Sequence, residues 1–527
     1  MSQSYVRSSY IDVILKPIQF NIIVQIKSNQ VKPSQVNALQ RMPESESISS
    51  VKYTTRDLIL YAAGIGCTTN TNTYTNSHDQ CNKHNEYNEY SEYSERRYLY
   101  EQDPSFQAFP LFPLALSFRA IPIPTPKLVS VEDTKDHHSP ISNRTSQEAN
   151  LDDFVWGIQP FPPYTMNSNN GGIGPLPSHF LRSHQTTHHD DDDDDDDDDD
   201  IQSEKEYPVI HISQSISIFH NLPVPYSARN TNTNKVDPPI TLQLSTKILQ
   251  VIPKAIGTFV ITQTNYYYSP PPSPTSKSDT QLLLCTAEAC TLILSLPPQN
   301  VLSYPSSSSP NSNSNIFQST SYTQFFQSEI QTQSPIYTQT IPLSQDQAIL
   351  YRLSGDSNSI HVDPTLSQTM LQLENPILHG NCTLGIALRS ILQYCHGNRS
   401  SHPSLHSKQE EKDRIDVTMQ VLQMYSKFTK PVEIGSILTV RVWSVHPSSR
   451  IPVSLRERLM TPPPTHTLDG IYSNWKIFLF QVWNNSKNSK DTKQTLVVDQ
   501  GLVQLSYDKG RTKEKTLYQY PPIPSNL

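Results

Sequence analysis

Three side chains that can transfer protons or hold water lie within six residues of one another, at Asp356, Asn358 and His361. A carboxyl group and an imidazole can serve as general acid and base, and the amide of Asn358 can donate and accept hydrogen bonds at once. Adding water across an activated double bond needs a base for the water, a proton source for the α-carbon and donors for the charge on the carbonyl oxygen. We interpret Asp356 as the base, Asn358 as the group that orients the water and His361 as the proton source.

The hydrogen-bond donor for the charge on the carbonyl oxygen is predicted to be the backbone N–H of Gly380. This glycine follows Pro376-Ile377-Leu378-His379 and begins an apolar helix. A glycine exposes its backbone N–H to a bulky substrate, and a helix start places that N–H at the positive end of the dipole. We expect the neighbouring His379 to be a packing or helix-entry residue rather than a proton carrier. Asp363 is expected to act as a structural hydrogen-bond acceptor.

The elements around these residues are typical of a helix wrapped by a sheet. Apolar residues at 384, 388, 391, 392 and 395 follow helical spacing, with Ile386 and Ala387 widening the face, which predicts a mostly buried helix. Ser344 and Gln347 form a capping-box pattern before an earlier helix. Three strand-like runs follow the buried helix, at 437–443, 475–483 and 495–505. One central helix with an antiparallel sheet around it uses all of these pieces.

The first half of the chain has a similar but interrupted pattern. Thr54 to Asp57 caps a short helix that ends at Gly64, and strands are predicted at 240–244 and 259–261. We expect residues 281–285 to pair with residues 291–294 as two separate strands.

Composition limits how much of the chain can form a core. Only 35% of the 527 residues are hydrophobic, and long stretches rich in Pro, Ser, Thr, Asn and Gln are predicted to be disordered. The formal charge of −8 includes eleven carboxylates from Asp190 to Asp200, so the remainder carries +3 and a nucleic-acid-binding protein is not indicated. We interpret this run, and the histidines 184, 188 and 189 beside it, as an expansion in a surface insertion rather than a metal or partner site.

Cysteine spacing and hydropathy exclude some classes of protein. The six cysteines contain no CxxC pair, which predicts neither a metal site nor a disulfide scaffold. Residues 11–26 are partly apolar but are broken by charged and polar residues, so neither a secretory leader nor a membrane span is predicted. The expectation is a soluble protein without a membrane span.

The motif around the site resembles that of the MaoC-like enoyl-CoA hydratase 2 family, which reads Asp-x-Asn-x-x-His followed by Pro-Ile-Leu-His-Gly. Both elements are intact here, as Asp356, Asn358 and His361 and as residues 376–380. Residues 348–355 and 427–432 resemble the flanking parts of the family, and residues 51–66 and 97–112 resemble its noncatalytic half. The aromatic residue and proline usual inside the motif are Ser357 and Ser359 in this chain, and the segment from His361 to Gly380 is one residue longer.

The resemblance implies an α+β double hot-dog fold, with two antiparallel sheets each wrapped on a helix. The implied organisation is an N-terminal extension (1–50), an N-terminal hot-dog half (51–296) with low-complexity insertions (70–95, 121–206 and 269–280), a Ser/Pro/Gln-rich linker (297–338), a catalytic hot-dog (339–508) and a tail (509–527). Either a monomeric double hot-dog or a homodimer fits this organisation.

The resemblance also implies reversible hydration of trans-2-enoyl-CoA to (3R)-3-hydroxyacyl-CoA in fatty-acid β-oxidation, without a metal or redox cofactor. Acyl-CoA is then the substrate, and Lys427 and Lys430 are candidates for contacts to the CoA phosphates, although an ordinary solvated strand edge is an equal explanation. Other readings are a hydroxyacyl dehydratase, a thioesterase, or a noncatalytic scaffold whose acidic and Pro/Ser-rich segments recruit partners.

The chain ends in Ser525-Asn526-Leu527, which is close to the Ser-Lys-Leu peroxisomal address. This ending predicts a peroxisomal location and an import receptor as a partner, with the cytoplasm as the alternative.

Overall fold

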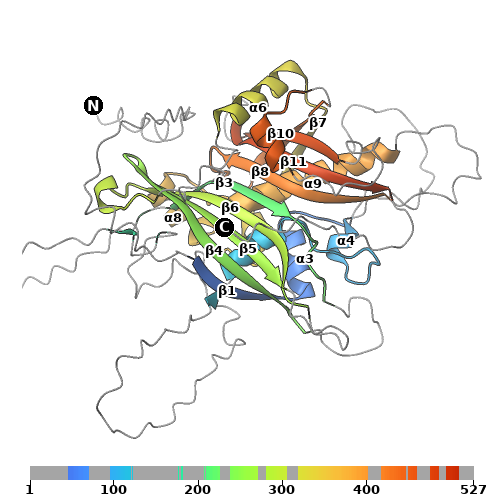
Figure 1. Cartoon of the computed structure of the whole chain (residues 1–527), viewed down its shortest axis with the longest axis horizontal. Helices are drawn as coiled ribbons and strands as arrows, with labels where there is room; N and C mark the ends of the chain where they lie inside the picture. Colours follow the sequence, from blue (N-terminus) through green and yellow to red (C-terminus); the bar gives the residue numbers. More distant parts are fainter. Residues whose placement is uncertain are drawn as a thin grey trace, which may run out of the picture.

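The computed structural model describes residues 46–69, 95–119, 121–122, 176, 180–181, 207, 209–225, 238–270, 281–304, 319–400, 417–446, 449–459, 475–485 and 494–509. The described strands form one 11-stranded sheet in the order β2-β1-β4-β5-β6-β3-β8-β11-β10-β9-β7 (Figure 1). The interpretations of the Asp190–Asp200 run, of most of the N-terminal extension and of the C-terminal tripeptide fall outside the described residues.

The N-terminal half begins with an edge strand and a helix, and its other strands follow later in the chain. The cap predicted at the start of helix α3 is a capping box. The side chain of Thr54 and the carboxylate of Asp57 each accept a hydrogen bond from the backbone N–H of the other residue. The elements of this half are β1 (Glu46–Tyr53), α3 (Thr55–Gly64), α4 (Arg96–Leu99), α5 (Phe112–Leu116), η1 (Ser117–Arg119), β2 (Ile121–Pro122), β3 (Val209–Ile218), β4 (Ile240–Lys254), β5 (Gly257–Tyr268), β6 (Leu282–Leu294) and η7 (Pro298–Asn300).

The C-terminal half has the longest helix among the described residues, α9, which spans 21 residues. Its buried face confirms the helix predicted from the spacing of Leu384, Leu388 and Ile391. The elements of this half are α6 (Thr320–Thr332), β7 (Tyr337–Pro342), α7 (Gln347–Arg352), η9 (Ser359–His361), α8 (Pro364–Leu371), α9 (Gly380–Ser400), β8 (Val417–Phe428), β9 (Ile437–Ser444), α10 (Val453–Arg458), β10 (Trp475–Asn485) and β11 (Gln494–Lys509).

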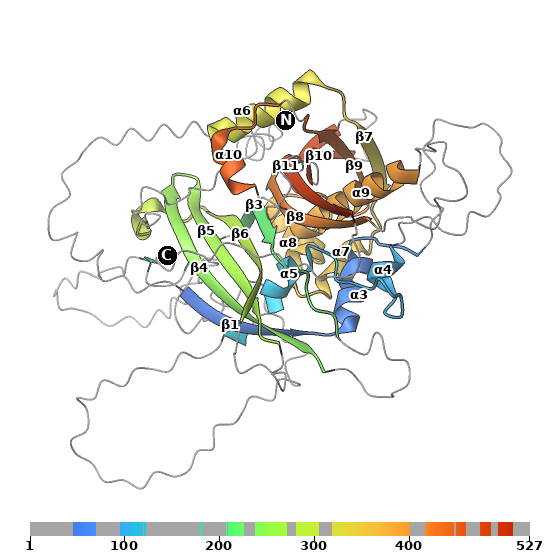
Figure 2. The same ribbon diagram turned by 45° about the vertical axis from the view of Figure 1, so that its right-hand side comes forward.

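The two halves share one topology. Apart from the short β2, the sheet order is β1-β4-β5-β6-β3 in the first half and, read from the opposite edge, β7-β9-β10-β11-β8 in the second. In each half the first strand lies at the outer edge and the next long strand along the chain lies at the seam, where β3 pairs antiparallel with β8. Helices α3 and α9 lie on the same side of the joined sheet, and their buried side chains share one hydrophobic core (Figure 2). The predicted double hot-dog fold is confirmed.

The segment predicted as a linker at 297–338 contains ordered structure, so that prediction is wrong in part. Helix α6 lies on the face of the C-terminal sheet away from α9, together with α10 (Figure 2). Tyr322, Phe325 and Phe326 recur at helical spacing and are buried there against Trp443 and Leu479. The polar composition of the segment hid this short apolar stripe.

Other predictions also need correction. Residues 281–285 and 291–294 belong to one strand, β6, because no turn-forming residue interrupts the alternation between them. Strand β1 begins at Glu46 and so crosses the predicted boundary at residue 50. Leu176 and Phe180, within the insertion predicted at 121–206, are buried against β5 and β6.

The capping box predicted at Ser344 and Gln347 is absent. The helix α7 is preceded by Asp346, and the Gln347 side chain instead donates a hydrogen bond to the carbonyl oxygen of Gly64. Gln347 therefore ties α7 to the end of α3, and the two halves are joined next to the loop that carries Asp356, Asn358 and His361.

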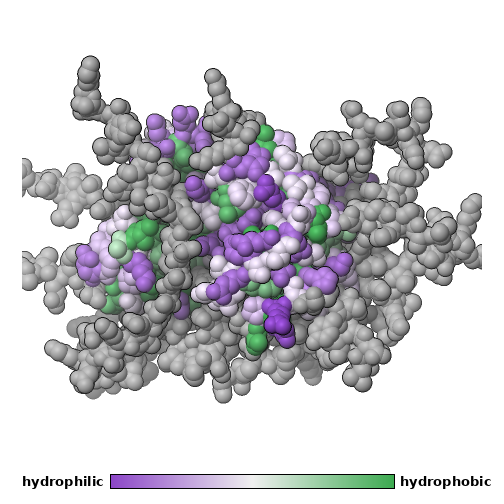
Figure 3. Space-filling view, turned by 90° about the horizontal axis from the view of Figure 1, so that it is seen from above, coloured by the Kyte–Doolittle hydropathy of each residue, from purple (hydrophilic) through white to green (hydrophobic). Residues whose placement is uncertain are grey.

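The surface of the described residues carries only separate hydrophobic areas on the side shown in Figure 3. None of the helices in the described part of the chain combines the length and the apolar character that crossing a bilayer requires.

Candidate active site

The loop that carries the predicted acid and base leaves α7 through Gly355, whose φ is +138°. A β-carbon at this position would lie 3.0 Å from the carbonyl oxygen of Ala115 and would run into the side chain of Arg119. Arg119 is held by an ion pair of 2.7 Å with Asp57. The N-terminal half thus packs directly on the residue before Asp356, and only glycine fits that contact and that backbone conformation.

Asn358 shapes the turn between Asp356 and His361. Its side-chain oxygen accepts a hydrogen bond from the N–H of Ile360 at 3.2 Å and caps the 3₁₀ turn η9, at whose end His361 lies. The oxygen is therefore occupied, and the NH₂ group of Asn358 is left as the donor that the amide can offer to a ligand.

The two serines that depart from the family motif do not prevent this turn. The carbonyl oxygen of Ser357 accepts a hydrogen bond of 3.2 Å from the Arg352 guanidinium, while Ser359 is exposed. Backbone contacts therefore hold the loop without the usual aromatic residue and proline. Sequence reasoning assigned no role to Arg352, since nothing in its spacing shows that its side chain turns back to the loop.

His361 is buried, and its Nδ1 lies 2.8 Å from the carbonyl oxygen of Ile377. Because a carbonyl can only accept, Nδ1 carries the proton in the neutral ring and Nε2 has a lone pair. The pKa of His361 is lowered to about 4, mainly by burial and in smaller part by the charge of Arg352, while the bond to Ile377 acts to raise it. The ring is thus neutral at physiological pH and presents Nε2 as a base.

Asp356 has the opposite shift. Burial raises the pKa of its carboxyl to about 7, although the N–H of Asn358 and the charge of Arg352 both act to lower it. The N–H of Asn358 lies 3.4 Å from Oδ1. Of the two groups, Asp356 rather than His361 therefore holds the proton near neutral pH.

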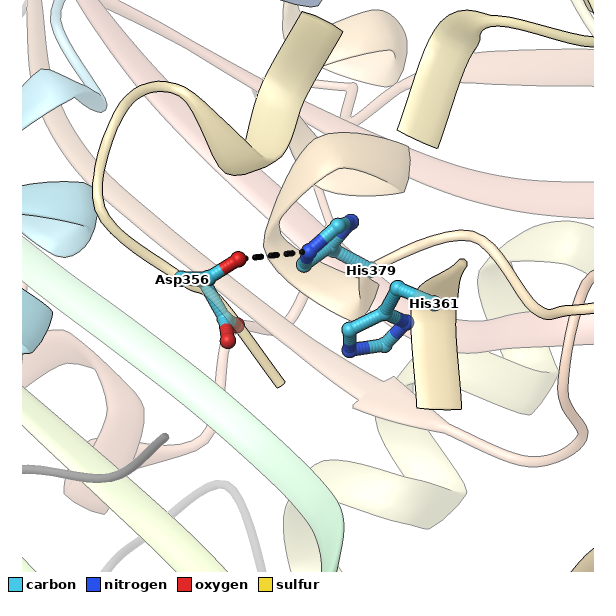
Figure 4. Close-up of side chains that lie close together, drawn as sticks. All are labelled: Asp356, His361 and His379. Atoms are coloured by element: carbon cyan, nitrogen blue, oxygen red, sulfur yellow. Dashed lines mark hydrogen bonds between the residues drawn. The ribbon is translucent and has the colours of Figure 1, made fainter. Parts of the chain in front are cut away.

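His379 lies against both of these residues (Figure 4). Its Nε2 donates to the backbone oxygen of Asp356 at 3.1 Å, and its ring stacks on the ring of His361 with centroids 3.6 Å apart. Burial, followed by the charge of His361, holds the pKa of His379 well below its usual range. This placement agrees with the packing role predicted for His379.

Asp356, His361 and His379 each offer a donor atom within 4.8 Å of the others, which is close enough to consider a metal site. A metal ion binds an imidazole nitrogen in the plane of the ring at about 2.1 Å. The two stacked rings are inclined by only 26°, so their planes do not converge within that distance. The geometry suits proton transfer rather than metal ligation.

Gly380 follows His379 and begins α9. A β-carbon at Gly380 would lie 3.0 Å from the ring of Phe428, which explains the glycine. The bond from the N–H of Thr383 to the carbonyl oxygen of His379, at 3.1 Å, is the start of the helical ladder. The N–H groups before it, including that of Gly380, have no carbonyl one turn back to bond.

The remaining candidate residues lie elsewhere. Asp363 accepts hydrogen bonds from the N–H groups of Thr365 and Leu366 and caps α8, as expected for a structural acceptor. Lys427 precedes Phe428 in β8, so its side chain points to the sheet face opposite Gly380, where Asp499 is its neighbour. The structure thus brings Asp356, Asn358, His361 and Gly380 together and leaves Lys427 outside the site. A role for Lys430 stays a prediction.

Comparison with known families places this site in a recognised domain. Residues 326–453 match the family model described as MaoC like domain, so the segment that carries the site is similar to that family. This segment includes α6 from Phe326 onward as well as the loop from Asp356 to His361 and α9.

Relatives of known name align with short stretches of the chain. The 3-hydroxyacyl-thioester dehydratase Y of Mycobacterium tuberculosis is 32% identical over 111 residues, which are 21% of this chain and 32% of the relative. The peroxisomal enoyl-CoA hydratase 2 of Arabidopsis thaliana is 49% identical over 53 residues, which are 10% of this chain and 17% of the relative. The matches therefore span a third or less of these relatives.

A solved structure is similar over most of the chain. The MaoC-like dehydratase from Phytophthora capsici aligns with 89% of this chain and 97% of its own, at 18% identity and a TM-score of 0.46.

Proposed function

We propose that this protein catalyses the reversible addition of water to trans-2-enoyl-CoA, forming (3R)-3-hydroxyacyl-CoA. The observation that carries the proposal is the pair of Asp356 and His361, which have opposite pKa shifts and both contact His379, the residue before the first N–H of α9. The names of the relatives, an enoyl-CoA hydratase and a hydroxyacyl-thioester dehydratase, describe the two directions of one reaction.

The protonation states suggest a division of roles opposite to the one expected from the sequence. The thioester oxygen accepts a hydrogen bond from the N–H of Gly380, which stabilises the charge that develops there. Water donates to Nε2 of His361 and accepts from the NH₂ group of Asn358. As the water oxygen bonds to C3, its proton passes to Nε2, and the carboxyl of Asp356 delivers a proton to C2.

The cycle closes without a change of oxidation state in the protein. After addition His361 is cationic and Asp356 is ionised, and return of one proton from the imidazole to the carboxylate restores the starting state. Dehydration follows the same steps in reverse. No step in this sequence calls on a redox cofactor, because the overall reaction only adds or removes water.

We further propose a role in fatty-acid β-oxidation inside the peroxisome. Support comes from the peroxisomal name of the Arabidopsis relative. Microscopy of a fluorescently tagged copy tests this location, and a signal that does not coincide with a peroxisomal marker would contradict it.

The experiment that tests the function is product analysis with the full chain. Purified protein is incubated with trans-2-decenoyl-CoA, and the product is hydrolysed and separated on a chiral column. We expect (3R)-3-hydroxydecanoate. Free CoA as the first product would indicate a thioesterase instead, and a folded protein that neither hydrates nor binds enoyl-CoA would favour the scaffold reading.

A further inference from the structure

A column of aromatic rings runs from the N-terminal half to the imidazole of His361. The ring of Tyr61, in α3, lies 5.7 Å from that of Tyr351, in α7. Tyr351 lies 4.8 Å from His379, which in turn is stacked 3.6 Å from His361. Tyr61 and Tyr351 are fully buried. His379 is thus held between a ring that is fixed in the core and a ring that would act on the substrate.

His379 contacts the acid and the base of the site through different parts of its side chain. The edge of the ring donates from Nε2 to the backbone oxygen of Asp356, and the face of the ring supports His361. Along the chain His379 directly precedes Gly380, whose N–H is the candidate donor to the thioester oxygen. One residue therefore links the three parts that must act together.

Histidine meets both geometric requirements, whereas phenylalanine and glutamine each meet one. Phenylalanine has the flat face but no donor at its edge, and glutamine has the donor but no ring. The second nitrogen of His379, Nδ1, is shielded from solvent and has no hydrogen-bond partner among the described residues. A proton on Nδ1 would leave a buried charge without an acceptor beside the His361 ring, so His379 is unsuited to carry protons during turnover.

We infer that His379 is a positioning residue, which fixes the backbone of Asp356 and the ring plane of His361 at the same time. This inference rests on the proposed hydration of enoyl-CoA. It adds a function to a residue whose sequence suggested only packing. Since misplacement of reacting groups by about 1 Å can cost on the order of 100-fold in rate, the effect of losing both contacts should be large.

The test compares three substitutions with a control. His379→Phe keeps the ring and removes the donor, His379→Gln keeps a donor and removes the ring, and His379→Ala removes both. The exposed His446, in the loop after β9, provides the control His446→Gln. For hydration of trans-2-decenoyl-CoA we expect kcat to fall about 100-fold for Ala and about 10-fold for Phe and for Gln, with KM within about twofold. KM should hold because a positioning residue acts through Asp356 and His361 rather than through substrate binding.

A second readout does not depend on turnover. In spectra of ¹⁵N-histidine-labelled protein, His361 of the wild type should show a proton on Nδ1. In His379→Ala the same signal should become a mixture of tautomers, because the unsupported ring is free to leave Ile377. Circular dichroism establishes that each variant is folded before either measurement.

The outcomes separate this inference from the proposed function. A wild type that hydrates enoyl-CoA, together with a folded His379→Ala variant whose kcat is within about threefold of it, would overturn the positioning role alone. An inactive wild type would remove the proposed function, and the tautomer of His361 would then decide the inference: an unchanged signal in His379→Ala would overturn it.

Discussion

Burial moves the pKa values of Asp356 and His361 past each other, so that the stronger base in solution becomes the weaker base in the site. The carboxyl rises to about 7 and the imidazole falls to about 4. Between these values the dominant form has a protonated Asp356 and a neutral His361. That form is ready to accept a proton from water on the ring and to donate one from the carboxyl.

The pH dependence of hydration should report both groups. We predict that kcat/KM for trans-2-decenoyl-CoA is bell-shaped, falling below about pH 4 as His361 gains a proton and above about pH 7 as Asp356 loses one. The residual activity of Asp356→Asn should lack the fall above pH 7, and that of His361→Gln should lack the fall below pH 4. Profiles of both variants that keep both limbs would assign the titrations to other groups.

The raised pKa of Asp356 also predicts a pH-dependent effect on stability. The folded protein holds this proton up to about pH 7, whereas the unfolded chain releases it near 3.8, so the site costs stability as pH rises from about 4 to 7. Asp356→Asn cannot ionise and should be more stable than the wild type at pH 8, by on the order of 4 kcal/mol. At pH 4 the two proteins should be nearly equal.

Denaturant unfolding at both pH values measures this effect. The lowered pKa of His361 also makes stability depend on pH, because the folded protein loses stability as pH falls from about 6.5 to about 4. This loss is the same in the wild type and in Asp356→Asn, so it cancels when the two are compared. A difference in stability that is the same at pH 4 and pH 8 would show that Asp356 is not a strained, buried carboxyl.

At the residue scale the sequence predicted which residues meet but not their protonation. The spacing of Asp356, Asn358 and His361 and the glycine at 380 were sufficient to place a site at the start of α9. The roles depend on burial and on the bond from Nδ1 to Ile377, which lies 16 residues away in the chain. Neither quantity has a signature in the local sequence.

Among the elements, α9 is anchored by a buried ion pair. Arg389 donates from Nε and from its terminal nitrogen to Glu95 at 2.6 and 3.0 Å, and Gln393 and the N–H of Thr68 complete the bonding of that carboxylate. Glu95 lies at the end of a segment predicted to be disordered, at 70–95. The pairing therefore fastens Glu95, the residue before α4, to α9.

Removing Glu95 should be costly because it leaves Arg389 charged and buried. We predict that Glu95→Ala lowers the free energy of unfolding by about 3–5 kcal/mol. The matched control is Asp103→Asn in the partly exposed pair with Arg96, whose N–O distance is 3.7 Å, where the loss should stay below about 1 kcal/mol. Urea unfolding measures both, and a loss of less than 1 kcal/mol for Glu95→Ala would mean that the pair does not anchor α9.

Helix α6 provides a test of the segment that composition marked as a linker. Phe326 is fully buried against the outer face of the C-terminal sheet, so Phe326→Ala should cost about 3–5 kcal/mol. Gln324 is exposed on the same helix, and Gln324→Ala should change stability by less than about 0.5 kcal/mol. If Phe326→Ala and Gln324→Ala both change the free energy of unfolding by less than about 0.5 kcal/mol in thermal and urea unfolding, the segment behaves as a linker after all.

At the element scale the sequence predicted elements with strong periodicity and missed those with mixed composition. The long apolar stripe of α9 and the strands at 437–443, 475–483 and 495–505 are found as expected. Strand β6 was divided because Ala287 and Ala289 weaken its pattern, and α6 was missed because three aromatic residues stand among Ser, Thr and Gln. In each case tertiary burial, rather than local propensity, decides the structure.

For the whole molecule, the repeated topology explains why two halves are needed for one site. Only the second half has the motif, yet Arg119, Tyr61 and Gly64 of the first half contact Gly355, Tyr351 and Gln347 next to it. The first half therefore supports the loop mechanically as well as completing the core. We expect the second half expressed alone to be unstable or inactive, because these contacts would be lost.

The central claim is that Asp356 and His361 add water to an enoyl thioester, and side-by-side kinetics test it most directly. The initial rate of trans-2-decenoyl-CoA hydration is measured for the wild type, for Asp356→Asn and His361→Gln, and for Asp363→Asn, which alters only the cap of α8. General acid or base catalysis contributes about 10²–10⁴-fold, so we predict losses of kcat in that range for the first two variants and a change within about threefold for Asp363→Asn. Folded Asp356→Asn and His361→Gln proteins that turn over at the wild-type rate would contradict the account.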